Sequence, residues 1–250
     1  MAHELIAGGD SYSIDDAFAV TIGYAFGEWS IEWRYPARGV GPPPEDVVAG
    51  RWLYRAYDCT PPHPGADLLG IDVIIADALN GQLRGSAIAV ITAIAPQLSS
   101  ALRMIPDETK FWQLPRQDVA GPPPEATTAW WLWRAWTLLA GAPGVGVAIA
   151  HKTLHHKRPE VFPLLDNRTI GRYADGESWA GIHDEINEAP AAWHELCRRF
   201  SAFATARGAV ALSRLRLHDI LVWTACTDGA AAGGSGGWPE GSHVRVAAVG

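Results

Sequence analysis

The chain has 250 residues, of which 48% are hydrophobic and 19% charged, and its formal net charge is −7. Enough apolar side chains are present to build a core, which excludes general disorder. No uninterrupted apolar run reaches the ~20 residues that span a bilayer, and the start resembles no signal peptide, so we expect a cytoplasmic protein without a membrane partner.

Residues 1–65 are expected to form a helical and irregular extension. Ser13 begins a helix that runs toward Gly27, because its hydroxyl can cap the first turn. An irregular connection follows over 29–44 and a short helix over 45–57. The string CTPPHPG at 59–65 then interrupts regular structure.

Helical patterning dominates from Ala66 onward, and the fold class is therefore all-α. Residues 66–227 are expected to form the core and 228–250, which contain AAAGGSGG, a flexible tail. Asp67 is the expected cap of a helix that ends at 80–81. The other predicted helices are 86–104, with a break or kink at Pro96, then 127–139, 190–207 and 212–224.

The predicted helix 127–139 carries four tryptophans, at 130, 131, 133 and 136. Trp130 and Trp133 share one side of that helix, which makes them candidates for stacking on a base. The alternative is that this stripe belongs to the core, which is the commoner use of aromatic side chains at helical spacing.

Residues 143–146 read PGVG and separate that helix from the next one. Gly144 and Gly146 permit a tight turn, and free N–H groups at the following helix start suit an oxyanion such as a phosphate. A helix–turn–helix corner that needs its glycines only for geometry is the alternative.

Basic residues are concentrated around this turn. Residues 125–172 hold six basic and three acidic side chains, a local charge of +3 in a chain of −7. Lys152, Lys157, Arg158 and Arg168 are the candidate phosphate ligands, although the acidic whole is unusual for a protein that holds duplex DNA. A solvated helix face would also explain them.

Asp166 follows the glycine turn by 20 positions, after the apolar residues 161–165. A carboxylate beside a breaking N-glycosidic bond stabilises the positive charge that develops on the sugar, or activates water. Asp-Asn-Arg-Thr is equally a good start for a helix, so Asp166 is expected to be a catalytic group, a helix cap, or both.

The hairpin and the aspartate together resemble the helix-hairpin-helix DNA glycosylase superfamily, and most of all its endonuclease III branch. The resemblance implies a glycosylase-like multi-helix domain, phosphate contacts at Gly144 and Gly146, and catalysis by Asp166. Bifunctional members carry a lysine where this chain has Ala148, so the resemblance implies a monofunctional hydrolase. Three scattered cysteines cannot build the iron–sulfur cluster of many relatives.

A second resemblance runs from Ala66 to Trp223. The strings ADLLGIDVIIADAL, HKTLHHKRPEVFPLLD and LRLHDILVW resemble recurrent blocks of a largely actinobacterial family of uncharacterised proteins, a domain of unknown function. It implies no activity.

No metal or cofactor is expected, because His151 and His155 lack a third ligand in the sequence pattern. The predicted function is removal of a modified base from DNA, and the enzymatic alternative is cleavage of a small nucleoside or nucleotide. A non-catalytic module that binds nucleic acid or protein is the third possibility. The sequence leaves the oligomeric state open.

Overall fold

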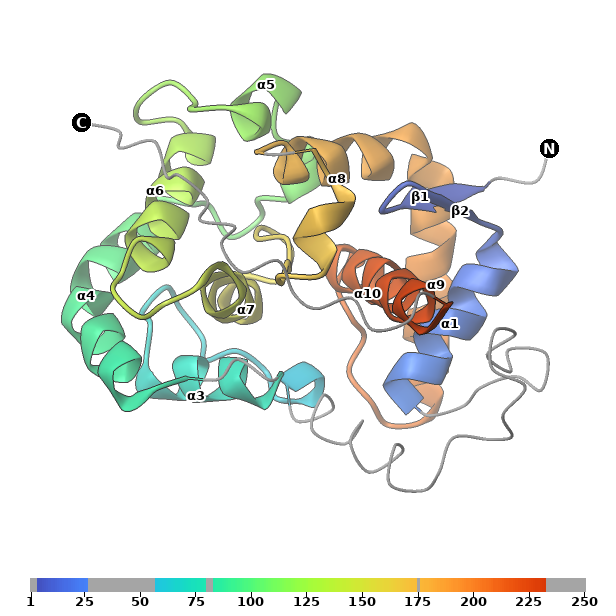
Figure 1. The fold of residues 1–250 in the computed structure, drawn as a ribbon, viewed down its shortest axis with the longest axis horizontal. Helices are drawn as coiled ribbons and strands as arrows, with labels where there is room; N and C mark the ends of the chain where they lie inside the picture. The colour runs from blue at the N-terminus through green and yellow to red at the C-terminus, as the bar shows by residue number, and fades with distance from the viewer. Residues whose placement is uncertain (1–3, 27–56, 80–82, 175, 233–250) are drawn as a thin grey trace.

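The structure is a computed structural model that describes residues 4–26, 57–79, 83–174 and 176–232. It contains 64% helix against 3% strand, which confirms the all-α class (Figure 1). The expected irregular stretch 29–44 lies outside the described residues. So does the expected helix 45–57, apart from Tyr57.

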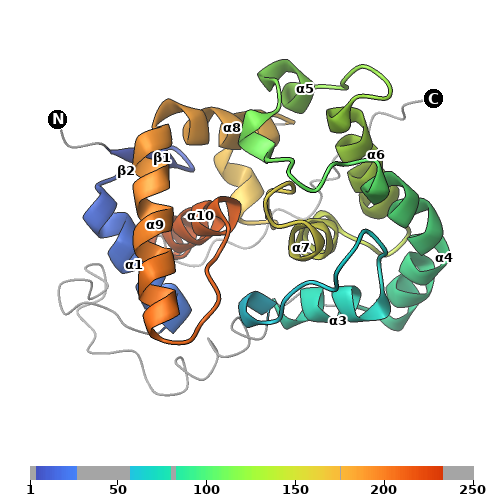
Figure 2. The same ribbon diagram turned by 180° about the vertical axis from the view of Figure 1, so that it is seen from behind.

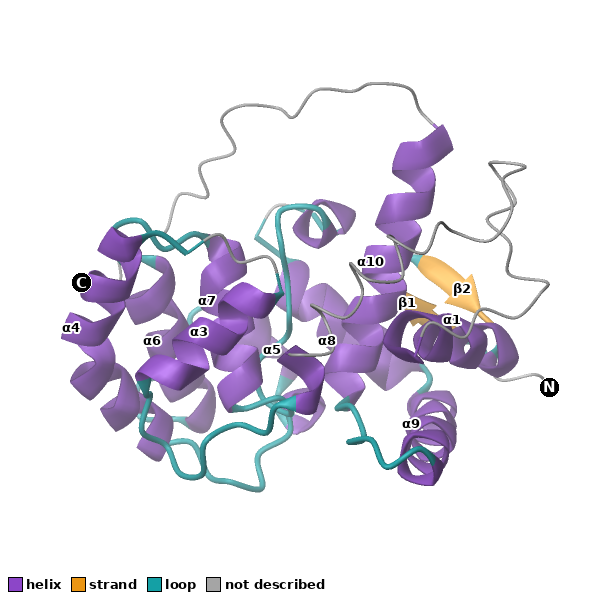
Figure 3. Cartoon of the chain, turned by 90° about the horizontal axis from the view of Figure 1, so that it is seen from below, coloured by secondary structure: helices purple, strands orange, loops and turns teal. Residues whose placement is uncertain are grey.

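A small β-hairpin opens the described chain and was not predicted. Strands β1 (Leu5–Ala7) and β2 (Asp10–Tyr12) pair antiparallel, with Leu5 opposite Tyr12 (Figure 3). Gly8 and Gly9 make the turn at φ 61° and 81°. Strands of three residues are too short to show an alternating pattern, which explains why the sequence did not reveal them.

Helix α1 (Ile14–Phe26) begins as expected, because Ser13 Oγ accepts the N–H of Asp16 at 3.1 Å. Helix α3 (Gly70–Ala78) is capped differently from the prediction: Asp72 Oδ2 accepts the N–H of Leu69 at 2.9 Å, while Asp67 lies before the helix and pairs with Arg103.

Helix α4 (Gly85–Arg103) continues through Pro96, so the chain does not break there, and a kink at Pro96, the other expected outcome, stays a prediction. Pro96 and Thr92 are both exposed, and the carbonyl that loses its intrahelical donor can therefore bond to water. Among the described residues, α4 alone is long and apolar enough to cross a membrane. A single helix that meets these two criteria is weak evidence of a membrane span. It packs against α6 (Thr128–Ala140).

The middle of the chain leads from α4 to the glycine turn. It contains η1 (Phe111–Gln113), α5 (Arg116–Ala120), α6 and α7 (Val147–Lys157). Thr127 caps α6 by accepting the N–H of Trp130 at 3.1 Å. Helix α7 lies between α3 and α6, and both contact it (Figures 1 and 2).

The C-terminal elements are η2 (Thr169–Arg172), α8 (Ser178–Glu188), α9 (Pro190–Ala206) and α10 (Arg214–Ala232). Helix α10 continues five residues beyond Thr227, to Ala232, and so includes the start of the expected tail, whose residues 233–250 lie outside the described chain. Helices α9 and α10 contact α1, as seen from behind in Figure 2.

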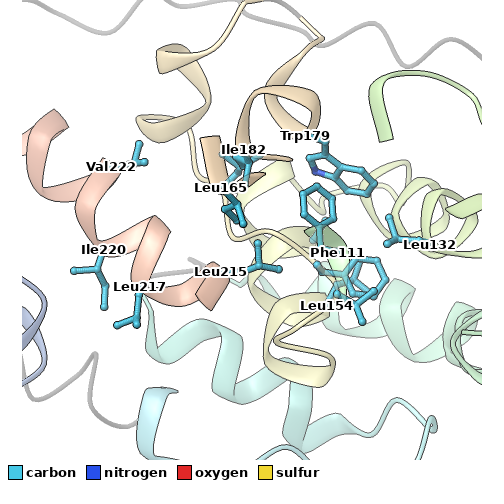
Figure 4. Close-up of a cluster of buried hydrophobic side chains, with 14 of the residues drawn as sticks. Phe111, Leu132, Leu154, Leu165, Trp179, Ile182, Leu215, Leu217, Ile220 and Val222 are labelled. Atoms are coloured by element: carbon cyan, nitrogen blue, oxygen red, sulfur yellow. The ribbon is translucent and has the colours of Figure 1, made fainter. Parts of the chain in front are cut away.

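One hydrophobic core joins these elements. Its centre includes Phe111, Leu154 and Trp179 together with Leu215 and Leu217 of α10 (Figure 4). Leu5 of β1 and Val20 of α1 belong to the same cluster. Residues 5–24, the described part of the expected N-terminal extension that reaches this cluster, therefore pack into the same core as residues 66–227.

Candidate functional site

The glycine turn is a tight connection between two packed helices. Helix α6 ends at Ala140, Gly144 adopts φ +78°, and Gly146 is the N-cap of α7. A Cβ at Gly144 would lie 3.8 Å from Cβ of Ala87, so the turn rests on the first turn of α4. Both glycines are exposed, which leaves the turn accessible to a partner.

Two lysines expected on the surface are buried instead. Lys152 is 5% exposed and donates from Nζ to the carbonyl of Leu79 at 2.7 Å, at the C-terminal end of α3. Lys157 is 3% exposed, and its Nζ donates to the carbonyl of His63 at 2.9 Å and to Asp72 Oδ2 at 3.3 Å. Burial lowers the pKa of Lys152.

These lysines therefore hold α7 against α3, and they do not form a phosphate-binding surface. The physical reason is that α7 is enclosed on all its faces: every residue from Ile149 to Lys157 is buried. Arg158 is also engaged, with its guanidinium donating to the carbonyls of Ile105 and Pro106. Of the four basic candidates, Arg168 alone is exposed.

Asp166 lies at the end of the apolar segment and is partly exposed. Its Oδ1 accepts the N–H groups of Arg168 at 2.8 Å and Thr169 at 3.0 Å, and its own N–H donates to Thr169 Oγ1 at 2.8 Å. Asp166 thus caps the following turn, as its sequence context suggested. That turn is the short 3-10 helix η2 and not a full α-helix, and the next α-helix, α8, begins at Ser178.

A buried ionic network is centred on Arg216 of α10, and α10 contacts η2, the 3-10 helix that follows Asp166. Arg216 donates to both carboxylate oxygens of Asp58, at 2.7 and 2.9 Å, and to the Tyr24 hydroxyl at 2.9 Å. It also binds Oδ2 of Asp219 one helical turn away. Sequence reasoning missed this network. The available signal was an Arg and an Asp three residues apart inside the apolar string LRLHDILVW.

Asp166, Lys152 and Asp219 are close enough to interact electrostatically. They come from the loop before η2, from α7 and from α10, and α10 contacts η2. Burial raises the pKa of Asp219 to about 7, with the charge of Asp166 adding to the rise and Arg216 opposing it. Two carboxyl groups and one ammonium group therefore share this region.

The tryptophan stripe belongs mostly to the core. Trp133 lies 4.8 Å from Trp179 between ring centroids, and its Nε1 donates to the carbonyl of Asp118 at 3.0 Å. Trp130 makes an edge contact with Trp131 at 4.4 Å. Both Trp130 and Trp133 are partly exposed, but Trp133 packs against the hydrophobic core and Trp130 is not among the residues that do, so the core interpretation fits Trp133 best.

His151 and His155 are buried and bonded inside the protein. Trp179 Nε1 donates to Nε2 of His151 at 3.1 Å, so the proton of a neutral His151 ring lies on Nδ1, which is 3.1 Å from the Val147 carbonyl. His155 Nδ1 lies 2.7 Å from the carbonyl of Phe162. No group of three or more possible ligands among the described residues could hold a metal ion.

Residues 40–226 match the model of a family of unknown function, DUF6308. Because the match covers most of the chain, the protein belongs to this family. No curated protein and no solved structure matches it.

Proposed function

We propose that this member of a family without an assigned activity is a hydrolytic N-glycosidase in which Asp166 is the catalytic carboxylate. The observation that carries the proposal is the placement of Asp166. Its side chain is partly exposed, and the N–H groups of Arg168 and Thr169 fix its Oδ1. A carboxylate oriented by backbone donors loses little rotamer freedom when a substrate binds.

The proposed chemistry places the Asp166 carboxylate beside C1′ of a sugar. As the C1′–N bond breaks, positive charge develops on the sugar, and the carboxylate stabilises it electrostatically. The same carboxylate accepts a proton from the water that attacks C1′.

The burial of the lysines bears on the substrate class. A duplex binder needs several exposed cations, because phosphate contacts supply most of its affinity. Lys152, Lys157 and Arg158 are committed to internal bonds. A small nucleoside or nucleotide is therefore the substrate class that we favour.

Removal of a modified base from DNA is the second candidate. The observation in its favour is the exposed glycine turn at the start of α7, which matches the phosphate-contacting hairpin that the sequence resembles. Exposed Arg168 would supply a further phosphate contact under this candidate.

The test is mass-spectrometric detection of free base from two sets of substrates: nucleosides and nucleotides, and duplex DNA with alkylated, oxidised or deaminated bases. Asp166→Asn is the expected inactive variant, because it removes the negative charge of the carboxylate. It should still fold, because an asparagine oxygen can accept the N–H groups of Arg168 and Thr169. Asp67→Asn, at an exposed pair with Arg103, is the matched control.

Release from nucleosides that Asp166→Asn abolishes and Asp67→Asn retains would support the favoured substrate class. Release from DNA alone would select the second candidate. If no substrate releases base while the protein is folded, the proposal is wrong, and a binding module in which Asp166 serves only as a cap would replace it.

A further inference from the structure

We propose that the outward face of helix α4 binds the same face of a second copy of this chain and so forms a symmetric dimer. This surface, the α4 face, consists of exposed uncharged residues in the middle of the helix: Ile88, Ala89, Thr92, Ala93, Pro96 and Gln97. The inference is independent of the catalytic role proposed for Asp166.

The α4 face points away from the hydrophobic core. Its residues form two adjacent rows at four-residue spacing, so they make one continuous strip along the helix. The opposite side of α4 supplies Ile91, Leu98 and Leu102 to the core cluster, and the helix packs against α6. Helix α4 lies at the edge of the described chain in Figures 1 and 2, where another molecule can reach it.

The absence of charge on this strip favours a second copy as its partner. From Gly85 to Leu102 the sequence contains no charged residue, although the whole chain carries a net charge of −7. Two copies with that charge repel each other, and the α4 face lets them meet without placing like charges opposite one another. Ile88, which is 42% exposed, then gains a surface on which to bury its side chain.

The charges at the ends of α4 match in an antiparallel pair. Exposed Arg84 is the N-cap of α4, and exposed Glu108 follows its C-terminal end. A two-fold axis across the middle of the α4 face brings Arg84 of each copy toward Glu108 of the other, and it aligns the helix dipoles in opposite directions. The other charged residues at these ends have a partner within their own chain: Arg103 pairs with Asp67, Asp107 pairs with Arg158, and Asp77 accepts the N–H of Leu83.

The size of the strip sets the strength of the dimer. Helix α4 has 19 residues and is about 28 Å long. The small side chains of Ala89 and Ala93 let two such helices approach closely, but one helix pair buries less than the roughly 800 Å² per partner of a standard interface. We therefore expect a reversible dimer with a Kd of about 10–100 μM.

A lipid surface is a poorer partner for the same strip. Thr92 and Gln97 would lose water in a bilayer without gaining a hydrogen-bond partner, whereas they can bond to each other between two copies. Helix α4 also cannot cross a membrane while Leu98 and Leu102 remain in the core.

The experiment is sedimentation velocity of the full chain between about 1 and 300 μM, a range that brackets the expected Kd. The wild-type protein should shift from the mass of one chain to that of two. Ala93→Glu places two new carboxylates near the two-fold axis and should raise Kd at least about tenfold, and Ala93→Lys should do the same with two ammonium groups. Ala202→Glu, at an exposed alanine of α9, is the matched control and should leave Kd unchanged.

An equimolar mixture of the Ala93→Glu and Ala93→Lys proteins distinguishes this dimer from other contacts. Opposite charges then meet across the axis, so association should return to the wild-type level or exceed it. A mixture that stays monomeric would overturn the proposal, as would a wild-type protein that is monomeric at about 300 μM or a dimer that Ala93→Glu leaves intact.

Flotation with neutral phosphatidylcholine vesicles tests the lipid surface directly. We expect the wild-type protein to remain in the soluble fraction. Binding to the vesicles that Ala93→Glu abolishes and Ala202→Glu retains would overturn the proposal and identify lipid as the partner of the α4 face.

Discussion

Nζ of Lys157 lies 3.3 Å from Oδ2 of Asp72, and neither side chain is exposed to solvent. The second oxygen of Asp72 has no hydrogen-bond partner among the described residues. The charge of this carboxylate is therefore balanced mainly by the ammonium group of Lys157. The pair joins the end of α7 to the first turn of α3.

Lys157→Met should therefore destabilise the protein strongly. It leaves a buried carboxylate without its partner, which costs about 3–5 kcal/mol. Urea denaturation measures the change in the free energy of unfolding. Arg103→Met is the control, since Arg103 and Asp67 form an exposed pair whose loss costs at most about 1 kcal/mol. Equal small effects of the two substitutions would show that the buried pair is not structural.

Gly144→Ala should cost about 1–2 kcal/mol, because alanine is strained at φ +78°. Space does not add to the cost, since the new Cβ would meet Ala87 at an ordinary 3.8 Å. Gly146→Ala is the matched substitution: φ there is −83°, and nothing lies within 4 Å of its Cβ. Thermal unfolding should separate the two variants, and identical melting temperatures would contradict the turn geometry.

His151 should remain neutral in the folded protein well below pH 6. Burial lowers its pKa from 6.5 to about 4, against the opposing bond to Val147. The folded pKa lies below the unfolded one, so the contribution of His151 to stability is complete above pH 6.5 and is lost as pH falls toward 4.

NMR titration of the His151 ring resonances measures this directly, with the urea-unfolded chain as the internal reference. A midpoint near 6.5 in the folded protein would mean that the ring is not enclosed by Trp179 as described.

Glu185→Ala should release the N-terminal hairpin. Oε2 of Glu185 accepts from the N–H of Gly8 at 3.0 Å and from His218 Nε2 at 2.7 Å, and Oε1 accepts from the N–H of Gly9 at 2.8 Å. Losing these bonds costs about 1–3 kcal/mol. Hydrogen exchange should accelerate at the Gly8 and Gly9 amides and stay constant in α4. Unchanged protection at the two glycines would show that Glu185 does not hold the hairpin.

Several helices could be predicted because their ends carry local signals. The expected helix 127–139 corresponds to α6 at Thr128–Ala140, with Thr127 as its cap, and the expected helix 190–207 corresponds to α9 at Pro190–Ala206, with proline in its first turn. Capping and proline placement depend on neighbouring residues alone, so the sequence is sufficient for them.

The surroundings of the candidate site could not be predicted in the same way. Lys152 and Lys157 look like solvated residues of a polar helix. Their burial depends on Leu79 at the end of α3 and on Asp72 within it, which lie 73 and 85 positions earlier in the chain. Asp219 attains its elevated pKa through burial by several distant elements. Asp166 could be proposed as a site residue because its spacing from the glycine turn is a local property of the sequence, and its catalytic role stays a prediction.

The central claim is that Asp166 performs N-glycosidic hydrolysis, and its most direct test is the ratio of base-release rates of the wild-type protein and Asp166→Asn under single-turnover conditions at neutral pH. We expect a ratio of at least about 100 on the best substrate, because a charge-stabilising carboxylate contributes at this level. The two proteins should give similar far-ultraviolet circular dichroism. A ratio near one, with both proteins folded and releasing base, would show that Asp166 is only a cap and that the chemistry lies elsewhere.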